Sequence, residues 1–158
     1  MTHRAVVITV SDRCSRGEAA DHSGPQIIER LADLDAQLVH RECIPDDAET
    51  IRRTAQTWIG RCDVLLLTGG TGIAPRDVTP DALRPLIERE LPGFGEVMRQ
   101  RAFERTPTSV LSRAGAGVCG QTLLVWMPGS PRAVSECVEW LTPAIRHACR
   151  QLAGDAAH

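Results

Sequence analysis

Val64-Leu65-Leu66-Leu67, followed at once by Thr68-Gly69-Gly70-Thr71-Gly72, is the stretch that decides the fold of this 158-residue chain. A short run of wholly apolar residues is typical of a central parallel strand that helices cover on both faces. The three glycines allow the backbone to turn sharply directly after the strand. The stretch therefore predicts a strand whose carboxyl end opens into a loop, the place where open α/β sheets bind their ligands.

Strand and helix patterns alternate on both sides of this stretch. Strands are expected at 5–10, 36–43 and 123–127, with short extended pieces within 109–119. Segments with the apolar spacing of helices lie between them, and the last one runs over 134–152. The alternation predicts an α/β fold, a three-layer αβα domain with a mainly parallel central sheet. Residues 1–158 are expected to form a single domain.

Capping residues and prolines predict where the helices begin and end. Ser23 and Asp46, each with Gln or Glu three residues on, fit capping boxes. Thr79-Pro80 is expected to supply the N-cap and first residue of a helix, with Pro85 early inside it. Thr142-Pro143 predicts a division of the last helix, because proline lacks the N–H that a helix interior needs.

The basic residues exclude several kinds of chemistry. All 18 are arginines, and the chain has no Lys, Tyr or Asn. Without lysine there is no Schiff base, no lysine-bound cofactor, no Walker-A site and no lysyl-AMP intermediate. The net charge of −2 and the five Trp and Phe residues argue against general nucleic-acid binding.

The cysteines and the chain start bear on location. Six cysteines and five histidines lie in no CxxC, HxxH or HExxH pattern, so neither a zinc site nor a disulfide scaffold is expected. Reduced thiols indicate a cytoplasmic location. Neither a signal peptide nor a membrane span is apparent from the sequence.

The candidate site residues lie in the loops that follow the strands. Each of them can be explained either by a functional role or by a purely structural one. Gly69–Gly72 is suited to hold a phosphate with backbone N–H groups, or it is only a tight turn. Asp77 beside such a loop favours a shared Mg²⁺, whereas Asp81 is better explained by the positive end of a helix. Asp46 taken alone is best explained as an N-cap.

Three further segments complete the ring of loops. Pro128-Gly129-Ser130 precedes the last helix as an anion-ready helix start, or as an ordinary turn. Arg113 could bind phosphate through its planar fork, or lie on the surface. Ser11-Asp12 ends the first strand and is otherwise a helix or turn cap.

Residues 68–82, Thr-Gly-Gly-Thr-Gly-Ile-Ala-Pro-Arg-Asp-Val-Thr-Pro-Asp-Ala, resemble the signature of the molybdenum-cofactor biosynthesis proteins of the MogA/MoaB type, which include the G domain of gephyrin. The resemblance continues through 92–99, 107–113 and 127–131. Upstream it includes 11–13, 21–25 and 44–46, so that it covers residues 4–150.

The resemblance implies a molybdopterin adenylyltransferase, a nucleotidyltransferase that moves AMP from Mg-ATP to the molybdopterin phosphate and releases pyrophosphate. It implies that Asp46 and Asp77 are catalytic and act through Mg²⁺. It also implies that Gly69, Gly70, Thr71, Gly72, Pro128, Gly129 and Ser130 hold the nucleotide, and that Ser112, Ser11 and Asp12 face the pterin and its phosphate. It further implies a homotrimer and a downstream molybdenum-insertion enzyme as partner.

One departure from the family pattern leaves alternatives open. Relatives often carry Arg at the position of Cys119 or Lys at that of Gln121, and this chain has neither. A non-catalytic molybdopterin-binding carrier is the first alternative. An enzyme of the same fold that processes another nucleotide is the second.

Overall fold

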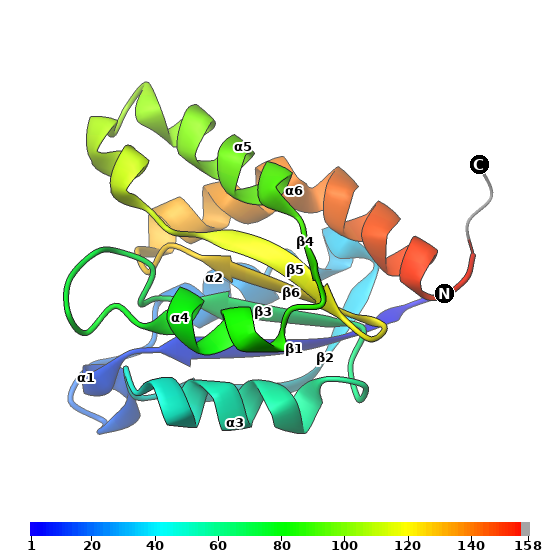
Figure 1. Cartoon of the computed structure of the whole chain (residues 1–158), viewed down its shortest axis with the longest axis horizontal. Helices are drawn as coiled ribbons and strands as arrows, with labels where there is room; N and C mark the ends of the chain where they lie inside the picture. Colours follow the sequence, from blue (N-terminus) through cyan, green and yellow to red (C-terminus); the bar gives the residue numbers. More distant parts are fainter. Residues whose placement is uncertain (156–158) are drawn as a thin grey trace.

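Six strands form one sheet in the order β2-β1-β3-β6-β5-β4 in the computed structural model, which describes residues 1–155 (Figure 1). Neighbours are parallel from β2 to β6, whereas β5 is antiparallel to both β6 and β4. The expected mainly parallel α/β sheet is confirmed. The strands are β1 (His3–Val10), β2 (Ala36–Ile44), β3 (Val64–Thr68), β4 (Arg89–Glu90), β5 (Gly115–Cys119) and β6 (Thr122–Met127).

Helices cover both faces of this sheet, which gives the expected three layers. One apolar core joins one face of the sheet to α2, α5 and α6, and a second joins the other face to α3 and α4. In Figure 1, α5 and α6 lie above the sheet and α3 lies below it. The α-helices are α1 (Asp12–Ser15), α2 (Ser23–Ile28), α3 (Ala48–Trp58), α4 (Thr79–Leu83), α5 (Pro92–Phe103) and α6 (Pro131–Leu152); the 3₁₀ helices are η1 (Leu31–Leu34), η2 (Arg84–Leu86) and η3 (Pro107–Leu111).

The apolar run in β3 is buried on both faces, as its composition predicted. Val64 and Leu66 point into the core under α6, whereas Leu65 and Leu67 point into the core over α3. All four are at most 1% exposed. The two-residue period of a strand thus divides one apolar run between two cores.

The edges of the sheet differ from the sequence expectation. β1 begins at His3 rather than residue 5, and the segment 109–119 holds the end of η3 before β5, the one extended piece expected there that the structure contains. β4 was not expected. Its two residues are exposed, pair only with β5, and are too few to produce a periodic pattern.

Each of the three predicted helix N-caps, those of α2, α3 and α4, is wrong by one residue. The N-cap of α2 is His22 and that of α4 is Val78, so that Ser23 and Thr79 are the first residues of their helices. The Ser23 hydroxyl donates to the Gly129 carbonyl at 2.6 Å, and the Thr79 hydroxyl donates to the Gly69 carbonyl at 2.8 Å. Both hydroxyls bind carbonyls in loops that follow other strands. Local sequence spacing does not reveal such distant partners.

The predicted division of the last helix at Thr142-Pro143 is also wrong, because α6 is continuous. Buried residues continue on both sides of the proline, with Leu141 before it and Ile145 after it. The Thr142 hydroxyl donates to the Val138 carbonyl at 2.7 Å within the same turns. Packing of one long apolar stripe on the sheet outweighs the missing backbone hydrogen bond.

Two further observations complete the fold. All six cysteines are free thiols in the structure. Among residues 1–155, there is no helix with the length and apolar character that crossing a membrane requires.

The proline inside α6 should cost stability that can be recovered. Pro143 is exposed, so Pro143→Ala restores an N–H to the helix interior without disturbing a core. We expect the free energy of unfolding in urea to rise by about 1–3 kcal/mol.

Pro131→Ala is the matched control, because Pro131 is the first residue of α6, where an N–H has no helical partner. A rise for Pro131→Ala equal to that for Pro143→Ala would contradict this explanation.

Candidate functional site

The candidate residues gather at the carboxyl edge of the sheet. β1, β2, β3 and β6 run parallel, so the loops that follow them start at the same edge. Because β5 is antiparallel, the segment that precedes it, including Ser112, reaches this edge as well. The sheet topology therefore brings the segments that contain all twelve candidate residues to one end of the molecule.

The glycine loop after β3 passes through a narrow gap. Gly69 and Gly70 have φ angles of 105° and 67°, which side-chain-bearing residues rarely adopt. A Cβ atom on Gly69 would collide with the Val10 carbonyl of β1, and one on Gly129 would lie 3.2 Å from the Gly69 Cα. The loops after β1, β3 and β6 thus meet at Gly69.

The same loop presents unused hydrogen-bond donors. The Gly69 N–H donates to the Met127 carbonyl at 3.0 Å. Within residues 1–155, the N–H groups of Gly70, Thr71 and Gly72 donate to no other protein group. Three consecutive free amides after a strand form the donor arrangement that suits a phosphate.

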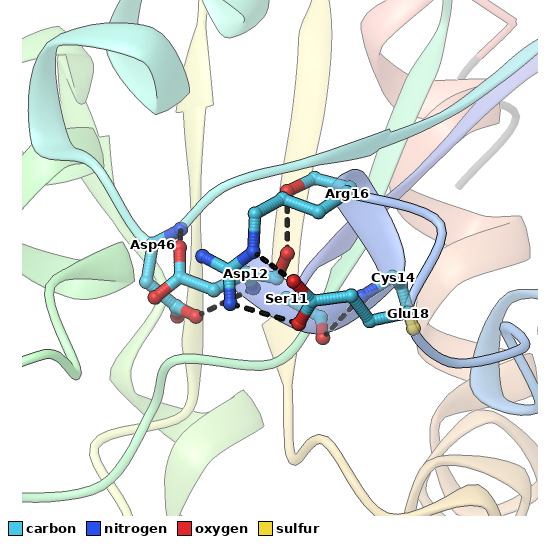
Figure 2. A network of polar contacts seen from close by, with 7 residues as sticks. Ser11, Asp12, Cys14, Arg16, Glu18 and Asp46 are labelled. Carbon is cyan, nitrogen blue, oxygen red and sulfur yellow. Dashed lines mark hydrogen bonds and ion pairs between the residues drawn. The ribbon is translucent and has the colours of Figure 1, made fainter.

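Two reciprocal hydrogen bonds between Asp12 and Asp46, here called the clasp, join the loops after β1 and β2 (Figure 2). The Asp46 N–H donates to Asp12 Oδ1 at 2.9 Å, and the Asp12 N–H donates to Asp46 Oδ2 at 3.1 Å. Ser11, next to this clasp, caps α1 by accepting from the Cys14 N–H at 3.3 Å, so its cap interpretation is confirmed. Figure 2 also shows the ion pair between Arg16 and Glu18, which follow α1 in the chain.

Asp46 is not the cap of α3, which corrects the interpretation of that residue taken alone. Asp47 is the N-cap, and its carboxylate accepts from the Thr50 N–H at 2.9 Å and from the Thr50 hydroxyl at 2.7 Å. Asp46 lies one residue further from the helix. Its carboxylate is therefore free of the capping role and faces the loops of the edge.

The Asp46 carboxylate is in an environment that disfavours its charge. Burial is the largest factor that raises its pKa, and the negative charges of Asp12 and Asp77 raise it further. The hydrogen bond from the Asp12 backbone and the positive charge of Arg76 act in the opposite direction. Asp46 and Asp77 are thus close enough to repel each other, which is the situation that a bound cation relieves.

The side chains at this edge offer few ligands to a metal ion. Within residues 1–155, no group of three or more His, Cys, Asp or Glu side chains is arranged to hold a metal ion. A pair of carboxylates beside free amides instead suits Mg²⁺, which takes most of its ligands from water and phosphate. Asp77 is oriented within its own turn, where its Oδ2 accepts from the Ala74 N–H at 3.0 Å.

Two cavities flank the Pro128–Ser130 turn and divide the remaining candidates. The larger, about 320 Å³, is lined by Ser112, Pro128 and Ser130. The smaller, about 210 Å³, is lined by Ser11, Gly69 and Gly129. Asp12, Asp46, Gly70, Thr71, Gly72 and Asp77 line neither of them. Ser112 and Ser11, expected to face one ligand together, line different cavities.

The larger cavity contains residues that sequence reasoning did not select. Arg105 and Arg132 both pair with Glu136, at 2.7 and 3.1 Å, and Trp140 lies on the same wall. The spacing of Arg132 and Glu136 on α6 was a visible signal for their pairing. Arg105 lies two residues after the end of α5, and no sequence pattern connects it to α6.

The departure at Cys119 and Gln121 falls outside this chain's own site. The turn precedes Thr122, the first residue of β6, whereas the candidate site follows Met127 at its other end, about 16 Å away. The Cys119 thiol and the Gly120 N–H both donate to Glu88 Oε1 there, at 3.3 and 2.9 Å.

This fold defines an α/β domain whose candidate residues lie where open parallel sheets generally bind their ligands. Residues 6–147 match the family described as "Probable molybdopterin binding domain", and the chain belongs to that family. The resemblance to the MogA/MoaB type is thereby confirmed.

Individual relatives cover nearly all of the chain. It is 37% identical over 153 residues to a molybdopterin adenylyltransferase of Helicobacter pylori J99, a match that covers 94% of this chain and 87% of the relative. It is 38% identical over 153 residues to gephyrin of Dictyostelium discoideum, covering 90% of this chain and 21% of gephyrin. The solved structure of the molybdopterin biosynthesis enzyme MoaB from Thermus thermophilus superimposes with a TM-score of 0.90 and is 40% identical, covering 97% of this chain and 98% of that one.

The close approach at Gly69 can be tested by adding a methyl group. Gly60 has a similar φ of 82° but open space around it, so Gly60→Ala should lower the free energy of unfolding by about 1 kcal/mol from backbone strain alone. Gly69→Ala should cost about 1–3 kcal/mol more, because the new methyl group meets a backbone carbonyl. Equal losses in urea unfolding would show that the gap is not narrow.

The raised pKa of Asp46 predicts that removing its charge stabilises the protein. The folded state binds the Asp46 proton more tightly than the unfolded state, so the charged form costs stability above that pKa. Asp46→Asn should raise Tm at pH 7 without added Mg²⁺. The gain should shrink as the pH falls through the raised pKa and vanish below about pH 3, where both states are protonated.

Asp47→Asn provides the control of opposite sign. Hydrogen bonds from Thr50 lower the pKa of Asp47, so its charge favours the folded state at neutral pH. This variant should lower Tm at pH 7. A fall in Tm for Asp46→Asn as well would refute the electrostatic explanation.

Proposed function

We propose that this protein is a molybdopterin adenylyltransferase of molybdenum-cofactor biosynthesis. The proposal is that it transfers AMP from Mg-ATP to the phosphate of molybdopterin and releases pyrophosphate. One observation carries most weight: Asp46 and Asp77 adjoin a loop with free amides, and two separate cavities open at the same edge of the sheet, although neither carboxylate lines them. A reaction that joins two ligands through phosphate needs a place for each and a shared centre between them.

The similarity to relatives supports the same reaction. The relative from Helicobacter pylori bears this activity in its name and aligns with nearly the whole chain. The MoaB structure from Thermus thermophilus bears the name of a molybdopterin biosynthesis enzyme.

In the proposed reaction, an oxygen of the molybdopterin phosphate attacks the α-phosphorus of ATP, and the bond from that phosphorus to pyrophosphate breaks. The amides of Gly70, Thr71 and Gly72 would hold phosphate oxygens. Asp46 and Asp77 would hold Mg²⁺, which supplies positive charge against the developing phosphate charge. The chain needs no covalent intermediate, so the absence of lysine is no obstacle.

The arrangement would act mainly through positioning. Asp12 holds the Asp46 backbone through the reciprocal hydrogen bonds, and Thr79 holds Gly69 and Gly70. Groups that are fixed before the substrates arrive cost no further ordering when the transition state forms. The larger cavity, with its arginines and Trp140, suits the flat and anionic molybdopterin.

Three other properties expected from the sequence stay predictions. The homotrimer, the downstream molybdenum-insertion enzyme and the cytoplasmic location rest on the family resemblance and the free thiols. A carrier that binds molybdopterin without ATP is the alternative to catalysis, and the following measurement separates the two.

Mg²⁺-dependent release of pyrophosphate from ATP and molybdopterin is the test. Asp77→Asn should lower kcat by at least about 100-fold while Tm stays within a few degrees, because the amide keeps the hydrogen bond from Ala74 but loses the charge. Asp47→Asn, which alters a neighbouring cap outside the site, should keep full turnover.

Absence of turnover by the folded wild-type protein, with molybdopterin bound and no ATP affinity in calorimetry, would support the carrier instead. Full activity of Asp77→Asn would remove Asp77 from the mechanism.

A further inference from the structure

We infer that Arg113 is the positioning residue of the loop that carries Asp77, and that Asp81 anchors it there. This assignment replaces both sequence alternatives, a phosphate ligand and a surface residue. It rests on the proposed function for its catalytic consequence, although its structural consequence can be measured without any substrate.

The Arg113 guanidinium binds three points along one loop. Its Nε donates to the Gly72 carbonyl at 2.9 Å, and its Nη2 donates to the Asp77 carbonyl at 2.5 Å. Its Nη1 lies 3.0 Å from both carboxylate oxygens of Asp81. One rigid planar group therefore joins the start, middle and end of residues 72–81.

This loop has little else to hold it. Residues 73–76 are exposed, and Ile73 is 66% exposed. Thr79 is buried and fixes the far end through its contacts with Gly69 and Gly70. Val78 packs against the core over α3, so that between Gly72 and Val78 the Asp77 turn depends on its own hydrogen bonds with Ala74 and on Arg113.

Arg113 is itself fixed to the sheet. The backbone N–H of Arg113 donates to the Thr71 carbonyl at 2.7 Å. The indole N–H of Trp126 on β6, a residue that is 6% exposed, donates to the backbone carbonyl of Arg113 at 3.0 Å. Arg99 on α5 donates to the carbonyls on either side, those of Ser112 and Ala114, at 3.3 and 3.1 Å. Because the backbone at Arg113 is held by β6 and α5, its guanidinium holds the Asp77 loop in a fixed position relative to these two elements.

The remaining capacity of Arg113 for an anion is small. A guanidinium has five N–H donors, and contacts from Nε, Nη1 and Nη2 already occupy most of them. The same hydrogen bonds hold the pKa of Asp81 below its ordinary range, so that carboxylate stays charged and competes with any phosphate for Arg113.

The two roles predict opposite effects of removing Asp81. If Arg113 were a phosphate ligand, Asp81→Ala would release its guanidinium, and the KM for ATP would fall. If Arg113 positions the loop, Asp81→Ala removes one of its anchors, and kcat falls about 3- to 10-fold with a smaller change in KM.

The direct test compares Arg113→Gln and Arg113→Lys with wild type by amide hydrogen exchange, without substrates. The Ala74 and Asp77 amides should exchange at least about 10-fold faster in both variants, because neither side chain can form the three-point fork. Arg53→Gln, an exposed arginine on α3, is the control and should leave both amides unchanged.

Turnover provides the second readout. Both Arg113 variants should lower kcat more than they raise the KM for ATP, and lysine should not rescue the loss. Unchanged exchange at Ala74 and Asp77, or recovery of kcat by lysine, would overturn the assignment. If the wild type shows no turnover, the proposed function fails, and the exchange result alone still decides whether Arg113 holds the loop.

Discussion

The close approach of three backbone segments at Gly69 is the constraint on which the rest of the site depends. Only a residue without a Cβ fits beside the Val10 carbonyl and within contact of Gly129. Because Gly69 donates to Met127 and accepts from Thr79, the strand ends of β1, β3 and β6 and the start of α4 are held together. The positions of the free amides that follow, at Gly70 to Gly72, are consequences of this junction.

Asp46, a carboxylate whose charge the folded protein disfavours, lies at the proposed catalytic site. Asp46 is kept half-buried beside Asp12 and Asp77, an arrangement that raises its pKa and disfavours its charge. Asp47 caps α3 and Asp81 pairs with Arg113, and by contrast the pKa values of these two carboxylates are lowered. Under the proposed function, a bound Mg²⁺ would relieve the repulsion around Asp46.

At the same site, the structure gives a reason why one basic residue, Arg113, is an arginine and not a lysine. Lysine could not replace Arg113, because a single ammonium cannot reach three acceptors in the plane of one group. In sequence terms, Arg113 was an isolated basic residue with two equally plain explanations. Its partners lie 32 to 41 residues away along the chain, so no local pattern could choose between these explanations or suggest the third.

The sequence by itself determined the order and type of the main elements, because the apolar run of Val64–Leu67 and the helical spacings around it reflect burial, which acts on each segment locally. It also determined the family, through residues 68–82, and the ring of loops that holds the candidate site. Only the tertiary structure decided between Asp46 and Asp47 as the cap, directed the Ser23 and Thr79 hydroxyls to distant carbonyls, and kept α6 continuous through Pro143. The Asp47 cap itself is local, through Thr50, but Asp46 is held by Asp12, 34 residues away. The partners of Ser23 and Thr79, and the sheet on which α6 packs, are likewise remote in sequence and become neighbours only when the sheet has formed.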